Sequence, residues 1–254
     1  MGRKYFAWSF DDGLEQDKRI IEILKEYGLG ATFHLNSGLF GDKTYEGRIG
    51  NLGMTEKPAA SFDPDTRHLL PYVPHFRIPT DEVAQVYEGF EIASHTCHHV
   101  NFAKCSEDER HAEIAEDVKA LSELFGQSVI GFAYPYGVGA KQSREALQAA
   151  GVQYARMATS KQGFRFPEDP LRMPLSCWHI SGKTFERLDA FFRTETEEDL
   201  FFLMFAHGYE FDFGTKESNW DKFRRICEAV ASRNDVIACS IGEAFRLHQE
   251  GNHE

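Results

Sequence analysis

Two pairs of residues in this sequence have the types and the spacing for metal-assisted hydrolysis. Asp11 and Asp12 are adjacent and are followed by Gly13, and His95 and His99 are four residues apart. On a helix or on a strand, that interval places the two imidazoles on the same face. Two histidines and one carboxylate, with positions left open for water, suit zinc and related divalent ions. We therefore predict that Asp12, His95 and His99 bind one divalent metal ion, zinc foremost, with cobalt, nickel or manganese as alternatives.

The Asp11–Asp12 pair follows a segment that has the pattern of a buried strand. Residues 4–8 are rich in aromatic side chains, and residues 16–27 carry isoleucine and leucine at helical spacing, so the pair lies on a strand-to-helix turn. Adjacent carboxylates there repel each other and lose hydration, unless a cation or a shared proton compensates the charge. An Asp-Asp-Gly sequence by itself is also common in solvated turns. The metal prediction therefore depends on the other polar motifs of the chain.

Strand and helix patterns alternate along the chain. Apolar segments predict seven strands, within residues 4–8, 31–35, 90–94, 129–134, 152–156, 200–205 and 236–239. Helical patterns separate most of them, within residues 16–27, 79–87, 106–125, 143–150, 184–193, 220–232 and 241–249. The alternation predicts an α/β fold with a parallel sheet inside a layer of helices, most simply a distorted or incomplete (β/α)7-type barrel. We expect a single domain over residues 1–254.

Residues 38–78 interrupt this pattern with clusters of Gly, Pro and Asp and without sustained periodicity. We predict a loop insertion within the domain, and long loops in compact domains are usually functional or mobile. A lid over the substrate and a solvated or oligomer-contacting loop are both open at this point.

Polar clusters follow four of the predicted strands. These clusters are Asp11–Asp12, His95–His99, Tyr136–Gly137 and His207. In barrels of parallel strands the active site is built from the loops at the carboxyl ends of the strands. We therefore expect the four clusters to meet at one end of the barrel.

The composition limits the classes of partner. The chain carries 28 Lys and Arg against 40 Asp and Glu, a net charge of −12 at pH 7. Nucleic acid and anionic membrane surfaces require basic patches, so we expect neither as a partner. No apolar run of ~18 residues is present to span a bilayer, and the first residues lack a secretory signal, so we expect a cytoplasmic protein. The five cysteines have no CxxC spacing and are expected to be reduced thiols.

Four segments resemble the motifs of the polysaccharide deacetylases, which are the NodB-homology or carbohydrate esterase family 4 proteins. Ser9–Gly13 (SFDDG) is similar to their first motif. His95–His99 (HTCHH) is similar to the second, a histidine, a serine or threonine, two variable residues and a histidine. Tyr134–Gly137 (YPYG) is similar to the third motif, and Phe205–His207 (FAH) to the fifth. Order and spacing match across nearly the whole chain, so the resemblance implies a NodB-like barrel and a hydrolase.

The resemblance implies a role for each matching residue in removing an N-acetyl, or an O-acetyl, group from a sugar or another acetamide-bearing molecule. The metal ligands would be Asp12, His95 and His99. Asp11 would be the general base that takes a proton from water activated by the metal. The backbone N–H of Tyr136 would stabilise the oxyanion, and His207 would be the general acid that protonates the departing amine.

The sequence departs from the family pattern at the third motif. The family usually has an arginine there that orients the base aspartate, and this chain has Ala133. We predict that Arg172, from another loop, takes that place beside Asp11.

The fourth motif, an aspartate and a tryptophan in the family, is also incomplete. Trp178 is the expected tryptophan and would line the acetyl pocket, but no aspartate is placed to pair with His207. Phe205 stands where the family has a leucine, and with Tyr134 it is expected to contact the substrate.

Two other functions remain open at this stage. One is hydrolysis of a non-carbohydrate linear or cyclic amide, since some relatives act on ureide-type substrates without a metal, although these lack the metal histidines. The other is a catalytically silent carbohydrate-binding module on the same fold, which the missing arginine and aspartate would explain. Metal occupancy separates the first alternative from a deacetylase, and acetate release separates the second.

Overall fold

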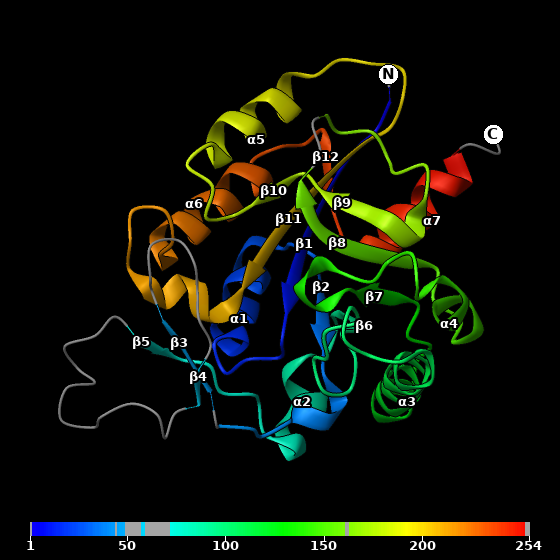
Figure 1. Ribbon diagram of the computed structural model, residues 1–254. Coiled ribbons are helices and arrows are strands. Elements are labelled where there is room, and N and C mark those ends of the chain that lie inside the picture. The colour runs from blue at the N-terminus through cyan, green and yellow to red at the C-terminus, as the bar shows by residue number, and fades with distance from the viewer. Residues whose placement is uncertain (1, 44, 49–56, 59–71, 161–162, 252–254) are drawn as a thin grey trace.

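The computed structural model describes residues 2–43, 45–48, 57–58, 72–160 and 163–251 (Figure 1). In this part of the chain, nine strands form one sheet in which every pairing is parallel. The strands are β1 (Lys4–Asp11), β2 (Ala31–Leu35), β6 (Glu91–Ser94), β7 (Gly131–Ala133), β8 (Tyr154–Ser160), β9 (Met173–Leu175), β10 (Cys177–Trp178), β11 (Leu200–His207) and β12 (Val236–Ala238).

The sheet curls into a barrel that is nearly closed. Its strand order is β10-β11-β1-β2-β6-β7-β8-β9, and β12 pairs with the first part of β1. Among the described residues, no pairing joins the two end strands, β9 and β10, so one seam stays open. These strands are three and two residues long, too short to complete a ladder. The predicted fold class, an α/β fold with an incomplete parallel barrel, is confirmed.

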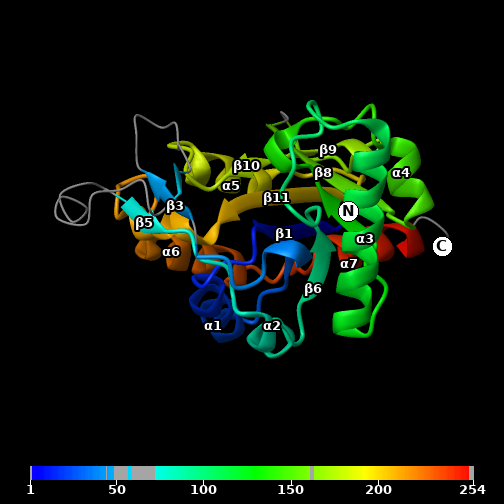
Figure 2. The same cartoon turned by 60° about the horizontal axis from the view of Figure 1, so that its bottom comes forward.

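Helices surround the barrel (Figures 1 and 2). They are α1 (Asp17–Tyr27), α2 (Thr80–Val86), α3 (Glu107–Phe125), α4 (Arg144–Ala149), α5 (Thr184–Arg193), α6 (Trp220–Ala231) and α7 (Ile241–Gly251). Local sequence sets their ends: Ser106 and Glu109 form a capping box at the start of α3, and Gly28 and Gly126 end α1 and α3 in the left-handed conformation. None of the described helices has the length and hydropathy of a membrane span.

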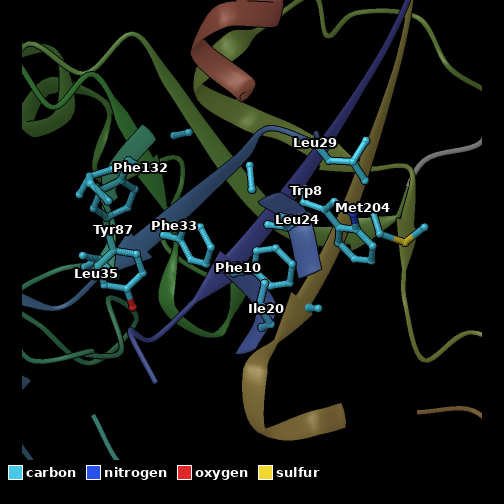
Figure 3. Packing of buried hydrophobic residues seen from close by; sticks show 14 of the residues in the cluster. Trp8, Phe10, Ile20, Leu24, Leu29, Phe33, Leu35, Tyr87, Phe132 and Met204 are labelled. Atoms are coloured by element: carbon cyan, nitrogen blue, oxygen red, sulfur yellow. The ribbon is translucent and has the colours of Figure 1, made fainter. Parts of the chain in front are cut away.

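The central strand β1 is buried along all eight residues, and its aromatic side chains build much of the core. The rings of Trp8 and Phe10 stack 5.2 Å apart, and Phe10 stacks on Phe33 of β2 at the same distance (Figure 3). Ile20 and Leu24 of α1 cover them from outside the barrel. This packing fixes the carboxyl end of β1, where Asp11 and Asp12 lie.

Most element predictions are confirmed, with one gap. All seven predicted strands and all seven predicted helices are present, but β9 and β10 lie in residues 158–182, which we predicted to be irregular. At three and two residues, both strands are too short for an alternation of apolar and polar residues to be recognised. Their pairing with β8 and β11 exists only in the tertiary structure.

The 38–78 segment is described only in part. Its described strands, β3 (Tyr45–Arg48), β4 (Lys57–Pro58) and β5 (Tyr72–Pro74), form a small antiparallel sheet that lies to the left in Figure 1. Residues 49–56 and 59–71, which hold much of the predicted loop insertion, lie outside the described residues. The single-domain assignment stays a prediction.

Candidate active site

The four polar clusters predicted from the sequence meet at the carboxyl end of the barrel. Asp11 at the end of β1 lies in register with His207 at the end of β11, and β6 and β7 lead into His95 and Tyr136. A cavity of about 530 Å³ opens between them. It is lined by Asp11, His95, His99, Tyr134, Tyr136, Gly137, Arg156, Ala158, Trp178, Phe205, His207 and Tyr209.

Asp12, His95 and His99 have the geometry of a metal site. Their ligand atoms all lie within 4.8 Å of one another. Asp12 Oδ1 lies 3.6 Å from His99 Nε2 and 3.9 Å from His95 Nε2. His95 donates its Nδ1–H to the carbonyl oxygen of Ala133 at 2.7 Å, so its Nε2 presents a lone pair to the two aspartates.

The oxygen at the centre of this group supports the same interpretation. Asp12 Oδ1 is buried and accepts no hydrogen bond within the described part of the chain. Arg77 Nη1 lies 3.1 Å from this oxygen, but the two imidazole nitrogens that also face it are favourably placed only if a cation lies between the three groups. Two imidazoles and one carboxylate are also a donor set that zinc and similar ions accept. The residues present therefore fit a divalent ion.

Backbone strain is concentrated at the same place. The non-glycine residues with positive φ in the described chain are Asp12 (φ 85°), Thr96 (66°), His99 (52°) and Tyr136 (58°). All four belong to the predicted motifs. Such conformations cost free energy and persist where the surrounding structure enforces them, as at ligand sites.

Asp11 lies beside this group and pairs with an arginine. Arg156, buried in β8, donates to both carboxylate oxygens of Asp11, and its guanidinium lies 4.4 Å from the ring centre of Phe205. His95 Nε2 and His34 Nδ1 lie 3.5 and 3.4 Å from the same carboxylate. Burial raises the pKa of Asp11, but Arg156, then the histidines, lower it to about 2. Asp11 is therefore ionised at neutral pH.

The position of Arg156 corrects the prediction for Arg172. Arg172 lies in the short helical turn η5 (Pro170–Arg172) with an exposed side chain, and the arginine that pairs with Asp11 is Arg156. Arg156 is instead the register partner of Ala133, the residue that replaces the family arginine. The arginine has moved to the neighbouring strand, from which its guanidinium still reaches the base aspartate.

His207 is held by a glutamate that the sequence did not point to. Glu210, completely buried in η6 (Gly208–Phe213), lies 3.1 Å from His207 Nδ1 and accepts a hydrogen bond from the His207 backbone N–H at 2.9 Å. It also accepts from Trp178 Nε1 at 3.2 Å. Burial lowers the pKa of His207, but the charge and hydrogen bond of Glu210 raise it to about 9. Glu210 therefore provides a carboxylate beside His207, for which the sequence analysis found no aspartate.

The predicted substrate-binding side chains all line the cavity. Trp178 and Phe205 lie 5.6 Å apart between ring centres, and Tyr134 is buried with its hydroxyl donating to the carbonyl oxygen of Leu171 at 2.8 Å. Tyr136 is 57% exposed, and its ring lies 4.8 Å from that of His99. Their contacts with a substrate, and the backbone role of Tyr136, stay predictions.

The sequence model of one family, polysaccharide deacetylase, matches residues 1–155 of the 254. The chain belongs to the polysaccharide deacetylase family. No curated protein matches this family member in sequence.

Solved structures with the same fold cover nearly all of this polysaccharide deacetylase family member. A candidate polysaccharide deacetylase from Mycobacterium smegmatis is 14% identical with a TM-score of 0.63, and the match covers 99% of this chain and 92% of that one. Puue allantoinase is also 14% identical, with a TM-score of 0.62 and the same coverage. A BA3943 mutant, described as a CE4 family pseudoenzyme with restored enzymatic activity, is 14% identical with a TM-score of 0.54. That match covers 95% of this chain and 67% of the BA3943 chain. At these identities the likeness concerns the fold alone.

Sequence reasoning missed three supporting residues of this deacetylase-family site. Arg156 ends a predicted strand, and an arginine in a buried strand requires a partner, which is a signal that could have found it. Glu210 follows His207 by three residues, but its direction depends on the turn η6. His75 lies in the 38–78 segment, and nothing in its local sequence connects it to Asp12.

Proposed function

We propose that this protein is a metal-dependent deacetylase that hydrolyses an N-acetyl, or an O-acetyl, group of a sugar or glycan. One observation carries the proposal: Asp12 Oδ1 and the Nε2 atoms of His95 and His99 converge in a buried site, beside the ionised Asp11. Family membership supports the same class of reaction. Zinc is the proposed ion, because the donor set of nitrogen and carboxylate oxygen suits it.

Asp12, His95 and His99 would hold the ion, whose charge acidifies water and polarises an acyl oxygen. Asp11 accepts the proton of the water as the water oxygen attacks the acyl carbon. The carboxylate can do so because Arg156 keeps it ionised and oriented.

His207 completes the reaction from the other side of the carboxylates. Its Nε2 lies 3.9 Å from Asp12 Oδ2, and Glu210 keeps its imidazole protonated at neutral pH. It donates a proton to the substrate nitrogen as the carbon–nitrogen bond breaks, which releases acetate and a free amine. The backbone N–H of Tyr136 would donate to the oxyanion, and Trp178, Tyr134 and Phe205 would enclose the acetyl group.

The silent binding module is the weaker alternative on the structure. Its main support was the loss of two family residues, the third-motif arginine and the fourth-motif aspartate. Arg156 contacts Asp11, and Glu210 contacts His207, so both charges are present from other positions. The main support for this alternative is therefore absent.

Hydrolysis of a non-carbohydrate amide is the closer alternative. The fold resembles that of an allantoinase as well as that of a deacetylase. The convergent ligand atoms of Asp12, His95 and His99 favour the metal-dependent deacetylase. Dependence on the metal therefore distinguishes the two.

The test measures acetate release from N-acetylglucosamine oligomers and from a model acetyl ester. We expect release that a chelator abolishes and that added zinc restores. No release from either substrate by zinc-loaded protein, together with chelator-resistant opening of a cyclic amide, would replace the proposal with the amide alternative. No reaction with any of these substrates, despite bound zinc, would favour the silent module.

A further inference from the structure

A short segment at the end of the 38–78 insertion reaches Asp12 from outside the barrel. His75 Nε2 lies 3.1 Å from Asp12 Oδ2. Arg77 donates to the backbone carbonyl oxygen of Asp12, and its Nη1 lies 3.1 Å from Asp12 Oδ1. Both side chains are buried, with 3% and 7% of their residue surface exposed.

Hydrogen bonds fix this segment against the turn that follows β1. The backbone N–H of Glu15 donates to the carbonyl oxygen of Phe76, and the backbone N–H of Ile78 donates to the carbonyl oxygen of Gly13, each at 2.9 Å. The His75 ring also packs 4.5 Å from that of Tyr209, between ring centres. His75 is therefore presented to Asp12 by a well-anchored backbone.

The two oxygens of the Asp12 carboxylate have different surroundings. Oδ1 faces His95 and His99, the other two candidate metal ligands, and lies 3.1 Å from Arg77 Nη1. Oδ2 faces His75 at 3.1 Å and His207 at 3.9 Å. A carboxylate accepts hydrogen bonds and cannot donate them, so the His75 nitrogen that faces Oδ2 carries the proton.

We propose that His75 is a positioning residue for the metal site. By donating to Oδ2 it sets the plane of the Asp12 carboxylate, so that Asp12 offers the metal one oxygen, Oδ1, and coordination positions stay open for water and substrate. The inference rests on the metal binding in the proposed function. Hydrogen-bond partners of metal ligands typically contribute ~10- to 100-fold to metal affinity.

His75 is not assigned as a fourth metal ligand. Among the described residues, the ligand group around Asp12 whose atoms lie within 4.8 Å of one another comprises Asp12, His95 and His99. Arg77 holds the strained backbone of Asp12, at φ 85°, through its carbonyl oxygen. Arg77 is therefore expected to support the turn, and His75 to orient the carboxylate.

The experiment compares the full-length protein with His75→Ala, His75→Gln and Phe76→Ala. Glutamine retains an N–H donor at a similar reach, and Phe76→Ala changes the neighbouring side chain but keeps the backbone carbonyl that holds Glu15. Cobalt and zinc dissociation constants are measured by competition with a chelator. The visible spectrum of the cobalt protein and the thermal unfolding of the metal-free protein are recorded in parallel.

We expect His75→Ala to weaken metal binding by ~10- to 100-fold, His75→Gln to recover most of that loss, and Phe76→Ala to bind like the parent. The cobalt spectra of the parent and of His75→Gln should coincide. Equal affinity of the parent and His75→Ala overturns the inference while leaving the deacetylase proposal intact. An equal loss in both His75 variants, with a changed cobalt spectrum, also overturns it and makes His75 a ligand. A parent protein that binds neither metal removes the deacetylase proposal as well.

Discussion

The buried carboxylates near the end of β1 have two different kinds of surroundings. Asp11 and Asp12 face cations and imidazoles, whereas Asp17, at the start of α1, accepts hydrogen bonds from the N–H of Leu14 at 3.1 Å and the O–H of Tyr87 at 2.7 Å. Asp11 is 3% exposed and Asp17 is 0% exposed.

The two environments shift the pKa in opposite directions. Burial raises the pKa of both groups, and the neutral donors around Asp17 do not offset it, so its pKa rises to about 7. Arg156 and the histidines more than offset the same effect at Asp11 and lower its pKa to about 2. Buried negative charge is therefore maintained where chemistry is proposed. Asp17, which is about half protonated at pH 7, instead connects the turn after β1 to the residue that follows α2.

The largest expected effect comes from removing the charge of Asp11. Asp11→Asn should lower kcat/KM by ~10²- to 10⁴-fold, the usual contribution of a general base, while metal affinity stays close to that of the parent. Asp17→Asn should leave kcat/KM within about threefold, a difference of ~0.7 kcal/mol. Steady-state kinetics and zinc titration of both variants test the comparison. An equal fall in kcat/KM in the two variants would contradict the contrast between Asp11 and Asp17.

Removing the cation beside Asp11 should destabilise the fold. Arg156→Leu leaves a buried carboxylate without its partner, which typically costs ~3–5 kcal/mol. Adding Asp11→Asn to Arg156→Leu should recover part of this loss, because the uncompensated charge is then gone. Arg172→Ala is the matched control and should change the free energy of unfolding by less than ~0.5 kcal/mol. Urea denaturation of the parent and these three variants measures the changes. A large loss of stability in Arg172→Ala would indicate that Arg172 supports the site after all.

A smaller effect is expected from the second charged pair. Glu210→Gln removes the carboxylate that raises the pKa of His207 to about 9. His207 must be protonated to act as the general acid, so the alkaline limb of kcat/KM against pH should move to lower pH. A shift of one unit corresponds to ~1.4 kcal/mol. An unchanged alkaline limb in this variant would mean that His207 is not the acid.

The smallest effect concerns the dependence of stability on pH. Because the folded-state pKa of Asp17 is about 7 and its ordinary value is 3.8, the folded protein binds a proton that the unfolded chain has released between these values. The stabilisation that this bound proton provides is complete below about pH 4 and is lost as the pH rises towards 7. The free energy of unfolding then falls by at most ~1.4 kcal/mol per pH unit.

Asp17→Asn should remove that slope. The free energy of unfolding of the parent and the variant, measured from pH 4 to pH 8, should therefore converge or cross as the pH rises. Parallel curves over this range would show that Asp17 is ionised in the folded state, and the contrast with Asp11 would disappear.

The sequence alone determined the fold class and the candidate metal ligands. Alternating apolar and amphipathic segments are regular over many residues, so the seven strands and seven helices could be located. Asp12, His95 and His99 are adjacent to strand ends, and the carboxyl ends of parallel strands converge, so their meeting could be predicted before any coordinates.

Only the tertiary structure decided which charges support those groups. Arg156 reaches Asp11 because β8 pairs with β7 in the register that places it opposite Ala133, and His75 reaches Asp12 because an insertion returns to the turn after β1. Glu210 reaches His207 through the path of one turn. A buried charge requires a partner of opposite charge or a hydrogen-bond donor, but this requirement does not indicate where in the sequence the partner lies. Sequence patterns therefore predict where strands end, whereas tertiary packing determines which side chains contact the residues at those ends.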